Sequence, residues 1–284
     1  GSERRIDSRR RKVRSRVGSG DHRGGGEAAL VARGLSAGYD DHLVLREIDC
    51  ALRAGKLTAV IGANGSGKTT LLHALSGILP LRSGEVTLQG EPIGKLRRRE
   101  IARWLTLVPQ FSDIGFEVTV AEAVALGRYP WVGPVQSLRG ADRQAIDRAI
   151  ALLDLETLRN RRLATLSGGE RQRVLLARSW AQDAAVFLLD EPVASLDLRF
   201  QQETYAHLRR LAHDANRAVL VADHHINLVA SFCDDVWLLN DTRIVAAGAA
   251  EATLTSEVVE SVFGLKMQQM WNHEGRPQFL WSRD

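Results

Sequence analysis

The sequence contains little cysteine, few aromatic residues and no long apolar segment. Only two of its 284 residues are cysteines, and Cys50 and Cys233 lie far apart, with a spacing that fits no metal site. We therefore expect a reducing, cytosolic compartment in which both thiols are small buried apolar side chains. No apolar run approaches the roughly 20 residues that a membrane-spanning helix needs, which predicts a soluble chain that docks, if at all, onto a separate membrane protein.

Excess positive charge is confined to one end of the chain. The formal net charge is +4, but residues 1–23 contain nine Arg and Lys and three acids and carry +6, which leaves the remainder at −2. An acidic remainder argues against a nucleic-acid-binding regulator. We expect residues 1–27, rich in Arg, Ser and Gly, to form a disordered basic tail, with contact to anionic lipid headgroups as an alternative. They lack the apolar stretch of a secretory signal.

Apolar runs alternate with helical patterns over residues 28–284, which we treat as a single domain. Short, nearly continuous apolar runs suit strands that are buried on both faces of a parallel sheet. The runs of this kind are Lys56–Ile61, Leu105–Val108, Val186–Leu189, Ala218–Ala222 and Val236–Leu239. Their alternation with helices predicts an α/β fold.

The flanks and the middle of the domain depart from this pattern. Ala29–Tyr39 and His42–Leu52 predict an antiparallel strand pair, which Val86–Leu88 extends. Residues 111–182 contain amphipathic helical stretches and no clear strand, so we expect an inserted helical subdomain there. Residues 266–284 predict a closing hairpin.

A glycine-rich turn after the first predicted parallel strand has the sequence of a phosphate-binding loop. Gly62–Thr70 matches G-x-x-x-x-G-K-[ST] between a predicted strand and a predicted helix. Its glycines permit backbone angles that turn N–H groups inward, and the helix directs its positive end at phosphate. Lys68 supplies a charge to the β- and γ-phosphates of ATP, and the Thr69 hydroxyl is placed to ligate Mg²⁺. The predicted nucleotide-binding residues are Gly62, Asn64, Gly65, Ser66, Gly67, Lys68, Thr69 and Thr70.

Two carboxylates follow a second apolar strand. Val186–Leu189 leads into Asp190 and Glu191, and open α/β sheets bind their ligands at this carboxyl edge. We predict that Asp190 holds Mg²⁺ and that Glu191, beside the γ-phosphate, polarises the attacking water. Without a phosphate loop, two such carboxylates would be an ordinary solvated strand end.

Between the two motifs lies the segment Leu166-Ser167-Gly168-Gly169-Glu170, the signature segment. With the loop, this segment and the Asp190–Glu191 strand in that order, the chain resembles the ATP-binding subunits of ABC transporters over about residues 28–265. The resemblance implies a P-loop NTPase (RecA-like) core with an antiparallel β flank and an inserted helical subdomain. It also implies ATP hydrolysis as the activity.

The resemblance assigns roles to positions that would be unremarkable alone. Tyr39 stands where the family stacks an aromatic ring on adenine, and Gln110 stands where a glutamine reaches Mg²⁺ and the attacking water. Asp197 belongs to a segment, beginning at Ser195, that lies at the subunit interface in the family. His224 matches the histidine that contacts the γ-phosphate; His225 is a rival in the next position.

The resemblance also implies that one copy of the chain does not complete a site. In the family, the Ser167 hydroxyl and the Gly169 N–H contact the nucleotide of the opposite subunit, with Gly168 between them. ATP would close two copies head to tail into a homodimer with two shared sites. A plain helix start, capped by Ser167 with Glu170 at the third helical position, is an alternative that is compatible with this role.

One further segment resembles a particular group within the family. Leu126-Gly127-Arg128-Tyr129-Pro130 is similar to a segment of the ATPases of importers for ferric siderophores, haem and cobalamin. That group implies two separate transmembrane permease subunits, an external substrate-binding protein, no nucleic acid, and a peripheral position on the cytoplasmic face of the bacterial inner membrane. From the residues alone, Thr119–Pro130 is an amphipathic helix that stops at proline.

Three positions depart from the family pattern. Val193 replaces a hydroxyl residue, His225 replaces an acid, and Thr242 replaces a turn glycine, which weakens a type I′ turn. The predicted catalytic residues are all retained: Gln110, Glu191 and His224. An alternative function is that of a soluble ABC ATPase in assembly or repair. The sequence lacks the coiled-coil insertion and second ATPase half that repair and translation-factor versions contain.

Overall fold

The computed structural model describes residues 28–110, 117–132, 137–194, 196–264, 266–272 and 275–281. The predicted basic tail, residues 111–116 of the predicted helical subdomain, and Ser195 lie outside the described residues. Among the described residues, no helix is long and apolar enough to span a bilayer.

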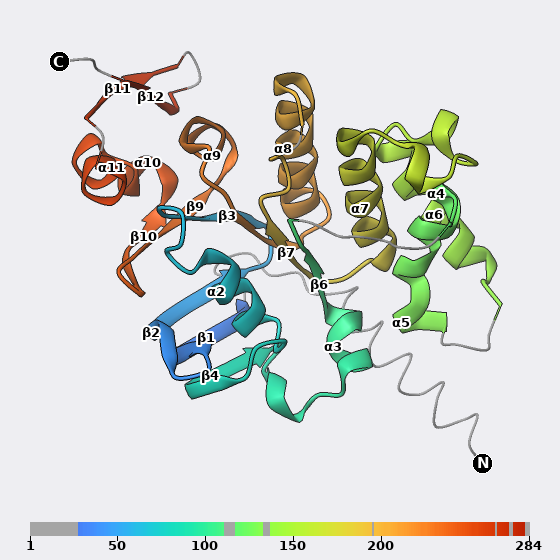
Figure 1. Cartoon of the computed structure of the whole chain (residues 1–284), viewed down its shortest axis with the longest axis horizontal. Helices are drawn as coiled ribbons and strands as arrows, with labels where there is room; N and C mark the ends of the chain where they lie inside the picture. Colours follow the sequence, from blue (N-terminus) through green and yellow to red (C-terminus); the bar gives the residue numbers. More distant parts are fainter. Residues whose placement is uncertain are drawn as a thin grey trace.

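The central sheet has the strand order β10-β9-β3-β8-β7-β6 and confirms the α/β prediction (Figure 1). All neighbouring strands are parallel except β10, which pairs antiparallel with β9. Every residue of β7 and β8 is buried, because both faces of these strands are covered. The strands are β3 (Lys56–Ile61), β6 (Leu105–Val108), β7 (Val186–Asp190), β8 (Ala218–Ala222), β9 (Asp235–Asn240) and β10 (Arg243–Ala249).

A second, antiparallel sheet has the order β2-β1-β4-β5 and confirms the predicted β flank. Its strands are β1 (Ala28–Tyr39), β2 (His42–Arg53), β4 (Leu81–Leu88) and β5 (Glu91–Pro92). Helix α2 (Lys68–Leu75) packs in one apolar core with this sheet and with the face of the central sheet that carries Val186 and Leu188. Cys233 is buried as predicted, but Cys50 is only half-buried because it lies on β2, near the edge of this core.

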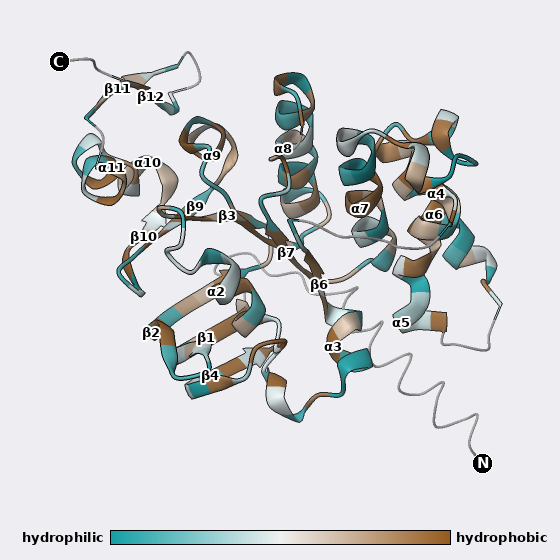
Figure 2. Ribbon diagram, viewed as in Figure 1, coloured by the Kyte–Doolittle hydropathy of each residue, from teal (hydrophilic) through white to brown (hydrophobic). Residues whose placement is uncertain are grey.

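The opposite face of the central sheet, which carries Phe187 and Leu189, belongs to a different apolar core. Helices α8 (Leu198–His213) and α9 (Ile226–Phe232) pack there, and so does the helical region that runs from residue 117 to residue 182. Figure 2 shows the brown, apolar strands of the central sheet enclosed by these layers. The helical region contains α4 (Val120–Ala125), η2 (Leu126–Arg128), α5 (Tyr129–Val132), α6 (Gly140–Leu152), η3 (Glu156–Leu158), η4 (Leu163–Thr165) and α7 (Gly168–Gln182).

The remaining elements surround these layers. A hairpin of β11 (Met267–Trp271) and β12 (Pro277–Trp281) lies at the C-terminal end, where the sequence predicts one. It contacts α9 through Asn227, whose side-chain amide bonds to both backbone groups of Phe279. The other elements are η1 (Ile93–Lys95), α3 (Arg98–Trp104), α10 (Ala250–Thr253) and α11 (Ser256–Phe263).

The prediction that a helix stops at Pro130 is wrong. The chain passes from α4 through η2 into a new helix, α5, and Pro130 is its second residue. Proline is tolerated in a first helical turn because its missing N–H would have no partner within the helix. The segment therefore bends without leaving helical structure.

The turn between β9 and β10 is formed without the glycine that its geometry favours. Asp241 and Thr242 have φ values of 42° and 72°, the signs that a two-residue type I′ turn requires. The Thr242 carbonyl accepts a hydrogen bond of 2.9 Å from the Arg46 N–H, and Arg243 pairs with Glu47 at 2.7 Å. Contacts with β2 thus hold a β-branched residue in a conformation that it disfavours.

We expect Thr242→Gly to increase the free energy of unfolding by about 0.5–1 kcal/mol. A β-branched residue in left-handed geometry costs about 1–2 kcal/mol, and the greater entropy of glycine in the unfolded chain offsets part of that gain. Urea unfolding with an unchanged m-value would measure it. Thr87→Gly, in the interior of β4, should instead destabilise the protein. A Thr242→Gly protein no more stable than the parent would contradict this account.

Candidate nucleotide site

Four neighbouring strands of the central sheet bring the predicted site residues to one edge. β3, β8, β7 and β6 are parallel and adjacent, so their carboxyl ends lie together. The phosphate loop follows β3, Asp223 and His224 follow β8, and Glu191 follows β7. Gln110 is the second residue after the end of β6. Residues widely separated in the sequence therefore meet at this edge.

The phosphate loop is shaped by two glycines. A Cβ atom on Gly62 would overlap the Leu239 carbonyl oxygen, and Gly67 has φ of 103°, a left-handed angle that side chains disfavour. Gly67 immediately precedes α2, so the positive end of this helix faces the loop. Ser66 Oγ is buried without a hydrogen-bond partner among the described residues. The loop thus offers an unsatisfied polar atom and a helix N-terminus to an anion.

Lys68 and Asp190 are charged groups held in a poorly solvated place. The Lys68 ammonium donates hydrogen bonds to the carbonyls of Gly62 (2.8 Å) and Ala63 (3.1 Å), which uses two of its three N–H groups. Burial lowers the pKa of Lys68, although the negative charges of nearby carboxylates oppose this shift. Burial raises the pKa of Asp190, although a hydrogen bond from the Thr69 side chain opposes the shift. A hydroxyl and an under-solvated carboxylate are oxygen donors that suit Mg²⁺.

Glu191 lies at the centre of the site. Gln110 Nε2 donates a hydrogen bond of 2.6 Å to its Oε2, and His224 Nδ1 lies 3.3 Å from its Oε1. The Glu191 backbone has φ of 44°, and its N–H bonds to the Ala222 carbonyl of β8. The structure therefore brings together the three predicted catalytic side chains, and the rival His225 makes no such contact with Glu191.

His225 instead pairs with Asp223, a buried carboxylate that the sequence analysis did not single out. Asp223 is fully buried and accepts hydrogen bonds from Tyr205 Oη (2.5 Å) and from the backbone N–H groups of His224 and His225. His225 Nδ1 lies 2.7 Å from the same carboxylate. These hydrogen bonds to the buried Asp223 carboxylate hold the turn that carries His224 in place. A metal ion at Asp223, His224 and His225 is not needed to explain their proximity.

The Asp223–His225 pair should make stability depend on pH. Burial alone would raise the Asp223 pKa, but the hydrogen bonds that this carboxylate accepts, first that of His225, lower it below 3.8. The hydrogen bond to Asp223 raises the His225 pKa above 6.5. The contribution of His225 to the free energy of unfolding is fully present below pH 6.5 and is lost as pH rises through its folded-state pKa. The contribution of Asp223 is present above pH 3.8 and is lost as pH falls through its lowered folded-state pKa.

We therefore expect the parent protein to exceed His225→Gln in stability most clearly between about pH 4 and 6.5, with the difference shrinking at higher pH. Urea unfolding of both proteins across this range would measure it. The same comparison for His42→Gln, at an exposed position, should show no such trend. A His225→Gln difference that stays constant with pH would contradict the pairing.

The signature segment lies on the other side of the central sheet from the phosphate loop. Ser167 caps α7 by accepting a hydrogen bond from the Glu170 N–H, and Glu170 Oε2 accepts one from the Ser167 N–H, as the capping alternative predicts. Helix α7 packs in the core that contains Phe187 and Leu189, whereas α2 packs against Val186 and Leu188. Ser167 and Gly168 are exposed and Gly169 is half-exposed, so the segment is free to meet another molecule.

Two further predicted residues lie at the borders of the site. Tyr39 ends β1, is 46% exposed, and has its hydroxyl 3.5 Å from His73 Nδ1 on α2, the helix that follows the phosphate loop. Asp197 caps α8 by accepting a hydrogen bond of 3.0 Å from the Phe200 N–H. Both side chains are exposed and can contact another molecule. Neither forms a hydrogen bond with Glu191 or Lys68.

The segment after α4 has a structural role that its sequence did not reveal. The Arg128 guanidinium is buried, pairs with Asp142 of α6 at 2.9 Å, and donates to the Ala181 carbonyl of α7. Trp131 Nε1 donates to the Gln182 carbonyl at 2.7 Å. The Gln182 side chain donates to the Ala102 and Leu105 carbonyls, so this segment connects the helical region to the central sheet beside β6.

Comparison with known proteins identifies relatives over most of the chain. A family model described as ABC transporter matches residues 45–194. The siderophore transport system ATP-binding protein YusV of Bacillus subtilis is 34% identical over 86% of this chain and 88% of its own length. The hemin import ATP-binding protein HmuV of Nocardia farcinica is 39% identical over 84% of this chain and 83% of its own.

A third relative is longer than the part that matches. The cobalamin import ATP-binding protein BtuD of Halobacterium salinarum is 38% identical over 84% of this chain, and the match spans 59% of that protein.

Among solved structures, an inward-facing conformation of a metal-chelate type ABC transporter aligns with a TM-score of 0.78 and 30% identity. That alignment covers 90% of this chain and 98% of the other.

Proposed function

The chain belongs to the ABC transporter family of ATP-binding proteins, and we propose that it powers import of a ferric siderophore, haem or cobalamin. The observation that carries the ATPase part is the convergence of the phosphate loop, Glu191, Gln110 and His224 at the ends of four adjacent strands. The names of the three relatives support the cargo class. The proposal keeps the domain boundaries predicted from the sequence, a basic tail over residues 1–27 and a single ATPase domain over residues 28–284.

Each residue at the sheet edge has a part in the proposed hydrolysis of ATP. The N–H groups of the phosphate loop and the Lys68 ammonium bind the phosphates and compensate their charge. Glu191 accepts hydrogen bonds from the attacking water and takes up its developing positive charge. Gln110 orients the Glu191 carboxylate. His224, whose Nδ1 lies 3.3 Å from Glu191, would donate a hydrogen bond to the γ-phosphate.

Mg²⁺ is proposed at the same edge, and the residues present fit it. Thr69 and Asp190 are hydrogen-bonded to each other, and each offers an oxygen atom as a metal ligand. Because Asp190 is buried, a divalent cation would stabilise its charged carboxylate. Gln110 would supply a third oxygen. When bound, the ion would supply charge neutralisation of the phosphates.

We propose that two copies of the chain assemble head to tail with two transmembrane permease subunits and an external substrate-binding protein. The placement of the signature segment on the opposite face of the sheet from α2 supports a site shared between copies. Ser167, Gly168 and Gly169 of one copy would contact the nucleotide of the other, with Asp197 at the interface and Tyr39 against adenine. The complex would lie at the cytoplasmic face of the inner membrane.

Uptake measurements would test the cargo. A strain that lacks the gene should lose ATP-dependent uptake of a labelled ferric siderophore, haem or cobalamin, and the full chain should restore it. The Lys68→Ala chain should not restore uptake, because the loop loses its cation. Arg143→Ala, on the exposed face of α6, is the matched control and should restore it. Unchanged uptake of all three cargo classes in the deletion strain would refute the importer assignment.

A further inference from the structure

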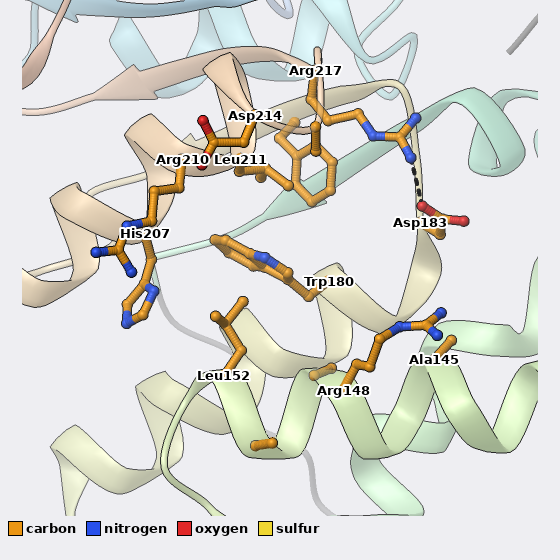
Figure 3. A pocket seen from close by; sticks show the side chains of 14 residues that line it. Ala145, Arg148, Leu152, Trp180, Asp183, His207, Arg210, Leu211, Asp214 and Arg217 are labelled. Atoms are coloured by element: carbon orange, nitrogen blue, oxygen red, sulfur yellow. Dashed lines mark hydrogen bonds and ion pairs between the residues drawn. The ribbon is translucent and has the colours of Figure 1, made fainter. Parts of the chain in front are cut away.

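A cleft of about 720 Å³ lies at the end of the central sheet opposite to the phosphate loop. It is bounded by α6, α7 and α8, by Phe187 near the start of β7, and by Arg217 just before β8. Asp190 and Glu191 lie at the other end of β7, so the cleft is separate from the nucleotide site. Figure 3 shows the indole of Trp180 extending between side chains of α8 and side chains of α6.

The floor of the cleft is apolar and aromatic. The rings of Trp180 and Phe187 have their centroids 5.7 Å apart with an interplanar angle of 59°. Leu152 of α6 and Leu211 of α8 lie on either side of Trp180. Phe187 is buried and Trp180 is half-buried, and the accessible part of the indole favours a flat apolar molecule stacked against it.

The rim of the cleft is basic. Arg148, Arg210 and Arg217 line it, together with the acids Asp183 and Asp214. Arg217 is paired with Asp183 at 2.6 Å, whereas Arg148 and Arg210 form no ion pair with any residue that the structure describes. Figure 3 shows the Arg210 guanidinium beside His207 and the Arg148 guanidinium on the other side of Trp180, so either end of the cleft complements an acidic group on the occupant.

A polar atom in the same lining lacks a partner. His207 Nδ1 is buried and makes no hydrogen bond with any described residue. Burial, and then the charge of Arg210, lower the pKa of His207, so the imidazole is neutral near pH 7. An unsatisfied buried nitrogen is costly, and because Nδ1 has almost no accessible surface, the imidazole would have to rotate before this atom could bond to an occupant.

We propose that this cleft is a binding site for a planar, mostly apolar molecule that carries an acidic group. The apolar body would lie on Trp180, and the acidic group would meet either Arg210 at one end of the cleft or Arg148 at the other. The occupant would contact α6, α7 and α8 at once. Because Ser167 caps α7, the occupant would fix the position of the signature segment relative to the core.

The fluorescent dye 8-anilinonaphthalene-1-sulfonate, a planar aromatic anion, is the probe for this site. We expect saturable binding to the full chain, with energy transfer from Trp180 to the dye. Arg148→Ala combined with Arg210→Ala should weaken binding about tenfold, because the sulfonate then lacks a charge-assisted contact at either end of the cleft. Ala145→Phe, which projects a ring into the cleft, should weaken it further. Arg143→Ala, on the same helix but outside the lining, should leave the dye affinity unchanged.

The outcomes separate the cleft from the nucleotide site. Excess ADP should leave the dye bound, and displacement by ADP would place the probe at the phosphate loop and overturn the proposal. Equal dye affinity of the parent, the double arginine variant and Ala145→Phe would also overturn it. Unchanged ATP affinity in each variant would establish that it is folded. The double arginine variant alters only side chains at the cleft rim, so it remains informative if Ala145→Phe does not fold.

Discussion

Glu191→Gln should retain ATP binding and lose at least about 100-fold of the hydrolysis rate. A general base contributes roughly 10²–10⁴ to a rate, and an amide of the same shape cannot accept charge from the attacking water. The structure supports the substitution as a clean test. Gln110 and His224 already hold this side chain by hydrogen bonds, and only 16% of it is exposed, so the amide occupies the same place.

Phosphate release at saturating ATP, together with the affinity for a fluorescent ATP analogue, would measure the two parts of this expectation. Glu203→Gln on α8 is the matched control, because that carboxylate makes only a surface pair with Arg199. Its hydrolysis rate should stay within about twofold of the parent. If Glu191→Gln hydrolysed ATP at the parent rate, another group would have to activate the water.

The position of these residues in the fold was predictable because it depends on local patterns. Short apolar runs predict buried parallel strands, and parallel strands end at one edge, so Glu191 was expected beside the phosphate loop. Gln110 and His224 were expected there only because of the resemblance to the ABC family. The different surroundings of His224 and His225 could not be predicted from the sequence. They depend on Asp223 and Tyr205, which meet only when α8 packs against the sheet.

Other features depend on tertiary contacts that no spacing in the sequence reports. The Arg128–Asp142 pair joins two helices of the helical region, and the pattern of either helix alone does not predict a buried guanidinium. Pro130 indicates a helix end, but the chain starts a new helix there. Thr242 predicts a weakened turn, and the backbone of β2 nevertheless holds it in left-handed geometry.

Ser167→Arg, introduced beside Glu191→Gln, should prevent the ATP-dependent dimer while leaving ATP bound to each monomer. In the Glu191→Gln background ATP persists, so the closed dimer accumulates and can be seen by sedimentation. An arginine at an exposed segment that meets the partner's nucleotide would fill the space of the interface. We expect the dimer to be weakened at least about 100-fold, which corresponds to about 2.7 kcal/mol. The ATP affinity of the monomer should change less than about twofold.

Loss of the helix cap is the competing explanation for such a result, and a second capped helix separates the two. Thr119 caps α4 with the geometry of Ser167: its hydroxyl lies 3.3 Å from the Glu122 N–H, and its own N–H lies 2.8 Å from Glu122 Oε2. The corresponding distances for Ser167 and Glu170 are also 3.3 and 2.8 Å. Thr119→Arg should therefore cost the same stability, about 1 kcal/mol, yet leave the dimer intact. Normal dimerisation of the Ser167→Arg protein would show that the signature segment does not complete a partner's site.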